Sequence, residues 1–418
     1  MDVELGIPGR SESMAYPKSF GGILPKIELF FRHNTRAAFA TIGFLCFVLI
    51  ISSDILHDSG FGPGGKFESS FSGTVHGGYF SVAGSKISNN QFHFAAVTDL
   101  DQLSFMKGER KMQYRSLLLP GTITRDVKTN KYSMVMEESN TRTLITKHNE
   151  AGRGAEFSEL TVFENRLLTF DDRTGEVFEI MNNQDGSDSF VAPRYVVTEG
   201  EGDTDKGMKW EWSTTKDGVL YMGSMGKEYT RPDGSIENVN NLWVTIMDKH
   251  GEFHRVNWTE QYNFIRKVLG CLSPGYLIHE AIRWSPHMRK WVLMPRRVSS
   301  ESYDDVKDEQ RGSNKVVIVD ESFTNAKVVE VQMASKDGLH GFSSFAFVPG
   351  TNDRHAIALR SVEEDCAQDD LDVCKQRSYI VIFDVMTGDV LMDEVKIKEN
   401  MKFEGIEFVN MYTKPQLS

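Results

Sequence analysis

Short hydrophobic runs, each followed by a turn and a second hydrophobic run that ends in charged residues, recur along most of the chain. The unit begins at residues 158 (SELTVF), 211 (EWSTTK), 280 (EAIRWS) and 343 (SSFAFV), and a fifth copy at residue 404 (EGIEFV) lacks its second run. Short apolar runs bounded by turn signals are typical of β-strands. A unit of strands repeated at roughly sixty residues predicts a β-propeller of four-stranded blades.

The fifth copy can be completed by a strand that lies earlier in the chain. Residues 92–101 (FHFAAVTDLD) have the pattern of a second strand with a charged end. We therefore predict an all-β fold, a five-bladed propeller over residues 91–410, whose ring is closed by this N-terminal strand. The 35 glycines fit many short strands joined by tight turns. Residues 411–418 are then a short C-terminal tail.

An uncharged apolar segment precedes the predicted propeller. Residues 37–53 (AAFATIGFLCFVLIISS) would cover roughly 26 Å as a helix, enough for a thin bilayer. Basic residues precede the segment and acidic residues follow it, so the positive-inside rule predicts a cytosolic tail over residues 1–36. We predict a single-pass type II signal anchor with the bulk of the chain in the lumen of the endoplasmic reticulum or Golgi. A cleaved signal peptide, giving a secreted form, is the competing interpretation. The Gly- and Ser-rich residues 54–90 predict a flexible stem.

Composition limits the partners and the redox chemistry of the chain. A net charge of -12 and a pI near 5.5 argue against nucleic acid, which needs a basic surface. Cys366 and Cys374 bracket a short acidic loop, and a luminal location favours a disulfide between them. Cys271 is left either buried or available to link two chains in a homodimer. Asn257 begins an N-W-T sequon, a glycosylation site on the luminal side.

The first position of every unit predicts a metal site. The first strand of each blade lines the central channel of a propeller, so these positions face one another across the axis: Ser158, Glu211, Glu280, Ser343 and Glu404. Three ionised carboxylates in a narrow channel repel one another unless a cation lies among them. Oxygen ligands suit a hard cation, and Ca²⁺ tolerates irregular geometry better than Mg²⁺. The pattern therefore predicts a central Ca²⁺ held by these five residues.

Polar clusters end the second strand of every unit. They are Asp99 and Asp101; Asp171, Asp172 and Arg173; Lys227 and Glu228; Arg296 and Arg297; and Arg360, Glu363 and Glu364. The repeat sends all of them to one face of the ring, where carboxylates alternate with arginine and lysine. Such a rim suits phosphoryl transfer, because cations clamp phosphate oxygens while a carboxylate orients water. We expect this rim to be separate from the axial metal ligands.

From about residue 94 to residue 408 the chain resembles the soluble calcium-activated nucleotidases of the apyrase family. The resemblance rests on TDLD (98–101), RGAEFSEL (153–160), DDRTG (171–175), KGMKWEW (206–212), GKE (226–228), GYLIHE (275–280), PRR (295–297), HGFSSF (340–345) and EGIEF (404–408). It implies a five-bladed propeller with Ca²⁺ in the tunnel, on the same five positions that the repeat selects. It also implies calcium-dependent hydrolysis of nucleoside diphosphates, UDP and GDP above all.

The rim and the resemblance together lead to predicted roles. The catalytic set is Asp99, Asp101, Asp172, Arg173, Lys227, Glu228, Arg296 and Arg297, with one of the first two aspartates orienting the attacking water. The substrate-binding set is Glu156, Glu199 and Glu201. The last two stand in E-G-E-G where the family has D-G-D-G, so the nucleotide preference stays open. Two other functions stay open as well: a calcium-dependent lactonase or esterase, which would not need the arginines, and a non-catalytic adhesion or scaffold propeller.

Overall fold

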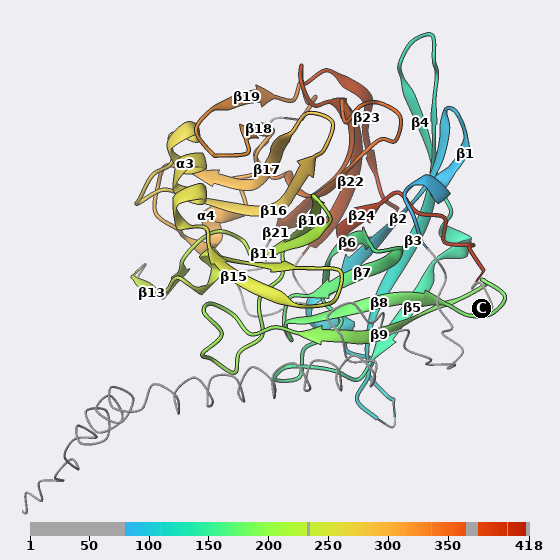
Figure 1. The fold of residues 1–418 in the computed structure, drawn as a ribbon, viewed down its shortest axis with the longest axis horizontal. Helices are drawn as coiled ribbons and strands as arrows, with labels where there is room; N and C mark the ends of the chain where they lie inside the picture. Colours follow the sequence, from blue (N-terminus) through green and yellow to red (C-terminus); the bar gives the residue numbers. More distant parts are fainter. Residues whose placement is uncertain are drawn as a thin grey trace, which may run out of the picture. The chain divides into compact units, whose positions relative to one another are not determined.

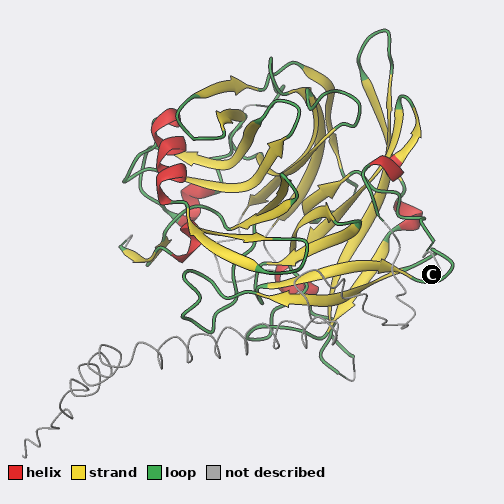
Figure 2. Ribbon diagram, in the orientation of Figure 1, coloured by secondary structure: helices red, strands yellow, loops and turns green. Residues whose placement is uncertain are grey.

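The computed structural model describes residues 80–414, except 110, 232–234, 336, 365–374 and 399. Strands make up most of this part of the chain and helices are few (Figure 2). The strands form five antiparallel sheets of four or more strands, arranged around a common centre (Figure 1). Each sheet is one blade of a propeller, as the repeat predicts.

The blades follow the chain with one exception, the first. Blade 1 consists of β24 (Lys402–Glu407), β2 (Gln91–Asp99), β3 (Tyr114–Arg125) and β4 (Tyr132–Met136), with β1 (Lys86–Ser88) beside β2 and β5 (Arg142–Thr146) beside β3. Blade 2 consists of β6 (Phe157–Phe163), β7 (Arg166–Asp171), β8 (Glu176–Asn182) and β9 (Ser189–Val196). Blade 3 consists of β10 (Trp212–Lys216), β11 (Val219–Gly223), β14 (Trp243–Met247) and β15 (Phe253–Asn257).

Blades 4 and 5 lie in the C-terminal half. Blade 4 consists of β16 (Tyr276–Ser285), β17 (Lys290–Ser299), β18 (Lys315–Asp320) and β19 (Ala326–Glu330). Blade 5 consists of β20 (Gly341–Phe347), β21 (His355–Glu364), β22 (Lys375–Asp384) and β23 (Val390–Lys396). The remaining elements are the hairpin β12 (Tyr229–Thr230) and β13 (Ile236–Asn238), helices α3 (Thr259–Leu269) and α4 (Asp305–Asp308), and four single 3₁₀ turns, Ala83–Ser85, Asp101–Ser104, Glu138–Asn140 and Asn240–Leu242.

The N-terminal strand closes the ring, as predicted. β24, the last strand in sequence, pairs antiparallel with β2, and Ala95 lies opposite Glu407. The innermost strands β6, β10, β16, β20 and β24 contact one another in that order, and β24 contacts β6 again. The ring therefore contains five blades and leaves no inner strand without a neighbour.

The core is divided into five hydrophobic layers, one between each pair of neighbouring blades. For example, Phe170 of blade 2 packs in one layer with Leu220 and Met222 of blade 3. Ile357 of blade 5 packs in another with Phe403 of β24. Because blade faces are covered on both sides, strands such as β8 and β24 are buried at every position. Burial on both faces does not make these strands apolar throughout, since β8 carries Glu176 and Glu179 and β24 carries Lys402 and Glu404.

The folded domain extends beyond both predicted boundaries. Phe80, which we assigned to the flexible stem, is buried in the layer between blades 1 and 2, and its N–H donates to the carbonyl of Asn165 at 3.0 Å. At the other end, Met411 is buried in the same layer. The Asn182 amide donates to the carbonyls of Met411 and Thr413 at 2.9 and 2.7 Å. Packed residues therefore lie on both sides of the domain boundaries that we predicted, inside residues 54–90 and inside residues 411–418.

Several predicted features concern residues that the structure does not describe. The cytosolic tail, the anchor at residues 37–53, most of the stem, and Cys366 with Cys374 all lie outside the described part. Among the described residues, no helix has the length and apolar character needed to cross a bilayer. Cys271 is a buried free thiol, a position that does not favour a bridge between two chains.

Candidate active site

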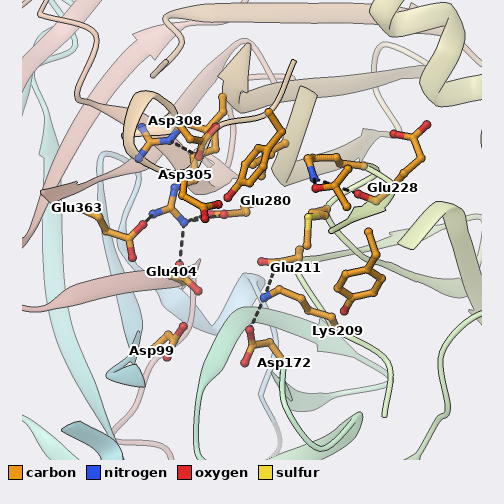
Figure 3. A pocket seen from close by; sticks show the side chains of 18 of the residues that line it. Asp99, Asp172, Lys209, Glu211, Glu228, Glu280, Asp305, Asp308, Glu363 and Glu404 are labelled. Carbon is orange, nitrogen blue, oxygen red and sulfur yellow. Dashed lines mark hydrogen bonds and ion pairs between the residues drawn. The ribbon is translucent and has the colours of Figure 1, made fainter. Parts of the chain in front are cut away.

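A polar pocket of about 400 Å³ receives side chains from all five blades. Its lining includes a member of each predicted cluster: Asp99, Asp172, Lys227, Arg296 and Glu363. Figure 3 shows the acidic side chains gathered around one space with basic groups between them. The repeat therefore brings the ends of the second strands to one face, as expected.

Three of the five predicted axial residues lie in this pocket. Glu211, Glu280 and Glu404 are at most 5% exposed, and their carboxylates point toward the same space (Figure 3). Ser158 and Ser343 do not line the pocket and are fully buried. The structure thus places the glutamates together at the inner end of the pocket.

Local breaks in strand pairing accompany the axial positions. The register shifts between Phe157 and Leu160 in β6, between His279 and Ile282 in β16, and between Phe342 and Ser344 in β20. Each interval contains the predicted axial residue, and a fourth shift lies opposite Glu404 in β24. β-bulges redirect side chains and are frequent beside active sites. The register shifts therefore occur at four of the five predicted axial positions and help to direct those side chains.

Every axial glutamate already has a basic partner from the protein itself. The Nη1 group of Arg296 donates to both oxygens of Glu280 at 2.6 Å and to Glu404 at 3.1 Å. Lys209 Nζ lies 2.6 Å from Glu211, and Lys402 Nζ lies 3.4 Å from Glu404. Arg296 also pairs with Glu363 of the rim. The expectation that the rim is separate from the axial ligands was therefore wrong, because Arg296 connects the two.

Burial governs the ionisation of the axial glutamates. It raises the pKa of Glu211 to about 8, with Glu280 and Asp172 acting in the same direction against Lys209. Burial also raises the pKa values of Glu280 and Glu404, although Arg296 and Lys402 oppose it. Burial therefore disfavours the ionised form of all three glutamates, even though Lys209, Arg296 and Lys402 favour it.

The rim carboxylate Glu363 behaves in the opposite way. Burial alone would raise its pKa, but Arg296, Lys402 and Arg297 together lower it to about 2. Glu363 is therefore ionised at neutral pH and fixes the guanidinium of Arg296 from the side opposite Glu280.

Some predicted rim residues lie away from the pocket. Asp101 is held by Arg153 at 3.2 Å and by the Gln376 amide at 2.7 Å. Arg173 donates to Glu150 at 3.0 Å. In the fifth cluster, Arg360 lines a different pocket, and Glu364 pairs with Arg377. Of the predicted catalytic set, the pocket therefore contains Asp99, Asp172, Lys227, Glu228, Arg296 and Arg297.

The comparison with known proteins identifies the family of the chain. The family model described as Apyrase matches residues 100–409. The chain belongs to the apyrase family. It is 37% identical over 319 residues to an apyrase of Cimex lectularius, covering 76% of this chain and 83% of that protein. It is 34% identical to apyrase apy-1 of Caenorhabditis elegans, covering 80% and 88% of the two chains. Soluble calcium-activated nucleotidase 1 of Rattus norvegicus is also 34% identical, with 76% and 74% covered.

Two solved structures resemble this apyrase-family protein only distantly. The Dos1 propeller gives a TM-score of 0.28 at 12% identity, covering 67% of this chain and 60% of that one. Streptogramin B lyase gives 0.26 at 9% identity, covering 78% and 94%. The five-bladed architecture therefore rests on the sheet topology of the chain itself.

The residues of this apyrase-family protein fit a calcium ion at the axial position. The hydroxyl of Ser158 is buried and has no hydrogen-bond partner within the described part of the chain, which a metal ligand would explain. The Ser343 hydroxyl donates to the carbonyl of Phe403 at 3.0 Å and keeps lone pairs free. Together with the three glutamates they offer only oxygen atoms, the donor type that Ca²⁺ prefers.

The three predicted substrate-binding glutamates lie in two different parts of the structure. Glu156 is buried, receives a hydrogen bond from Arg153 at 2.7 Å, and lies close to Asp99 and Asp101. Burial and the nearby Asp99 raise its pKa to about 9. Glu199 accepts a hydrogen bond from Asn240 at 2.8 Å, and Glu201 is exposed. These two residues lie between β9 and β10 and do not line the pocket.

Sequence reasoning missed several residues of the pocket. Lys209 and Lys402 each precede an axial glutamate by two positions, a spacing visible in the sequence. Tyr303, Asp305 and Asp308 come from the segment between β17 and β18, which has no repeat pattern. Tyr303 places its ring 4.1 Å from Lys227 Nζ and so forms an aromatic wall.

Proposed function

We propose that this apyrase-family protein hydrolyses nucleoside diphosphates, UDP and GDP in particular, to the monophosphate and phosphate in a calcium-dependent reaction. The observation that carries the proposal is the pocket itself. Buried carboxylates form its inner end, while Arg296, Arg297 and Lys227 line the same pocket. This combination can hold a cation and a polyphosphate together.

The axial residues Ser158, Glu211, Glu280, Ser343 and Glu404 would hold the Ca²⁺. The ion would neutralise phosphate charge and polarise a phosphoryl oxygen. Arg297 lies beside Arg296 in β17, where its side chain donates to the carbonyl of Leu339 at 3.0 Å and lies 3.6 Å from Asp308. Its remaining donors are available to the terminal phosphate, together with the third donor of Lys227, whose ammonium group already donates to the carbonyl of Glu228 at 3.0 Å and to the hydroxyl of Thr230 at 3.1 Å.

A carboxylate at the edge of the pocket would orient the attacking water. Asp99 and Asp172 both line the pocket and face the space between them (Figure 3). One Asp172 oxygen is buried without a hydrogen-bond partner in the described residues, and the other pairs with Lys209. Tyr229 and Tyr303 offer aromatic surface on which a nucleoside can pack.

We further propose that the enzyme acts in the lumen of the secretory pathway as a type II membrane protein anchored by residues 37–53, or in a secreted form. The side chain of Asn257 is exposed at the end of β15, which supports its use as a glycosylation site. A Cys366–Cys374 disulfide suits the same oxidising compartment. Assembly into a homodimer belongs to the proposal as well.

Phosphate release by the purified full-length protein tests the function. UDP, GDP, ADP and UMP are supplied with calcium, with magnesium, and with a calcium chelator. We expect release from UDP and GDP only when calcium is present. The matched control is Glu280→Gln, which keeps the shape of the side chain but removes its charge. Absence of phosphate release from every diphosphate in calcium, by a protein that is folded, would overturn the proposal. Hydrolysis of neutral esters or lactones instead would favour the alternative enzyme class.

A further inference from the structure

Two lysines occupy corresponding places in two blades. Lys209 precedes Glu211 in the sequence K-W-E, and Lys402 precedes Glu404 in the sequence K-F-E. In extended chain, side chains two residues apart point to the same side. Both lysines accordingly line the pocket together with the axial glutamates that follow them.

Each lysine connects an axial glutamate with an aspartate of the rim. Lys209 Nζ contacts Glu211 Oε1 at 2.6 Å and also pairs with Asp172 (Figure 3). Lys402 Nζ lies 3.4 Å from Glu404 Oε1 and also contacts three rim carboxylates, Asp99 at 2.7 Å, Asp101 at 3.2 Å and Glu363 at 3.5 Å. The two ammonium groups are therefore placed between the inner end of the pocket and its edge.

A divalent cation and an ammonium group compete for the same carboxylate oxygens, Oε1 of Glu211 and Oε1 of Glu404. A Ca²⁺ held by Glu211 and Glu404 would lie against two positive charges, and the repulsion is large where water is scarce. Lysine can respond because its charge is carried on a flexible four-carbon stem. The rim aspartates Asp99 and Asp172 remain as partners when the glutamates are taken.

We propose that Lys209 and Lys402 are exchangeable counter-ions that couple cation binding to phosphate binding. Without a divalent cation, they neutralise the axial glutamates. When the cation takes those carboxylates, the ammonium groups move to the side of the rim aspartates and bind the phosphates of the substrate. The inference rests on the proposed function for the identity of the substrate, but the coupling itself concerns only cation and phosphate.

The proposal has a thermodynamic consequence. If calcium frees two phosphate ligands, calcium must tighten phosphate binding, and phosphate must tighten calcium binding by the same factor. Static lysines that only stabilise the fold would produce no such contribution. The two interpretations therefore differ in binding equilibria, without any reference to turnover.

The coupling is measured by calorimetric titration of the purified full-length protein with calcium alone and with inorganic phosphate alone, and then with each in the presence of the other. In the wild type, we expect each to tighten the other by about tenfold or more. In Lys209→Met and Lys402→Met, calcium alone should bind more tightly because a competing charge is gone. The calcium-dependent gain in phosphate affinity should fall at least about fivefold.

Lys216→Met is the matched control. Lys216 lies at the far end of β10 from Glu211 and pairs with Asp217 at 3.0 Å and Glu321 at 2.7 Å. This substitution removes the same charge and should leave the coupling unchanged. Lys209→Gln and Lys402→Gln, which keep a hydrogen-bond donor, are measured in parallel so that misfolding of one variant does not decide the result.

The outcomes separate the two proposals. Phosphate affinity within twofold of wild type in the calcium-loaded lysine variants would overturn the exchange, even if UDP is hydrolysed. Absence of any coupling in the wild type would overturn it as well. Coupling that falls in the two lysine variants but not in Lys216→Met, in a protein that hydrolyses no diphosphate, would support the exchange and reject the proposed function instead.

Discussion

Replacing Arg296 with methionine should destabilise the protein strongly without calcium and much less with it. Arg296 is 5% exposed, and its guanidinium is shared among Glu280, Glu404 and Glu363. Removing one partner of a buried ion pair costs about 3–5 kcal/mol, because the remaining charge is left unpaired in a medium of low dielectric constant. Calcium bound by Glu280 and Glu404 would neutralise both carboxylates. Only Glu363 would then lose a partner, and Lys402 remains 3.5 Å from it.

Thermal unfolding of the full-length chain, in chelator and in saturating calcium, measures the effect. For a domain of this size, 3–5 kcal/mol corresponds to a drop in Tm of roughly 4–7 °C, which should appear in chelator and at least halve in calcium. Arg289→Met is the control, since Arg289 precedes β17, is half exposed, and pairs with Asp217 and Glu321. A surface pair of this kind contributes at most about 1 kcal/mol. An equal drop in Tm in both conditions would refute a calcium ion shared by Glu280 and Glu404.

Three further predictions follow from the same structure. Glu211→Gln, Glu280→Gln and Glu404→Gln should each weaken calcium binding by about tenfold or more, measured by calorimetry, because a charged ligand is lost; unchanged affinity in all three would exclude the axial site. Phe80→Ala should lower the free energy of unfolding by about 3–5 kcal/mol in denaturant titrations, since the ring is buried, whereas a flexible stem at this position predicts no change. A chain that begins after Asp101 should aggregate on size exclusion, because it lacks β2 and leaves β24 unpaired; a monodisperse folded product would contradict ring closure.

The sequence predicted the ring well because its signal is repeated. Glu211, Glu280 and Glu404 stand at the same point of successive units, so a shared environment followed from propeller geometry alone. The closing strand was predictable for a related reason, since residues 92–101 supply the second strand that the last unit lacks. Both inferences needed only the spacing of the repeat along the sequence, which places one inner strand in each blade.

Features outside the repeat were not predictable in this way. Phe80 and Met411 are single buried residues in irregular segments, so they give no periodic signal. Glu199 and Glu201 stand in a sequence motif that the family resemblance selected, yet neither lines the pocket, and the Asn240 amide donates to Glu199. Arg296 was correctly placed on the face of the site, but its reach to two axial glutamates depends on side-chain direction, which spacing does not determine.

The pairing of β2 with β24 also affects the order in which the protein can fold during translation. β2 leaves the ribosome early, beside β1 and β3, but its inner partner β24 is made only after the four other blades have been translated. Until then, the inner edge of β2 is exposed and open to wrong partners. Lys402 and Glu404 arrive on that same late strand, so cation binding cannot assist the early steps of folding. We therefore expect the nascent chain to depend on chaperones until β24 pairs with β2. The same pairing completes the pocket.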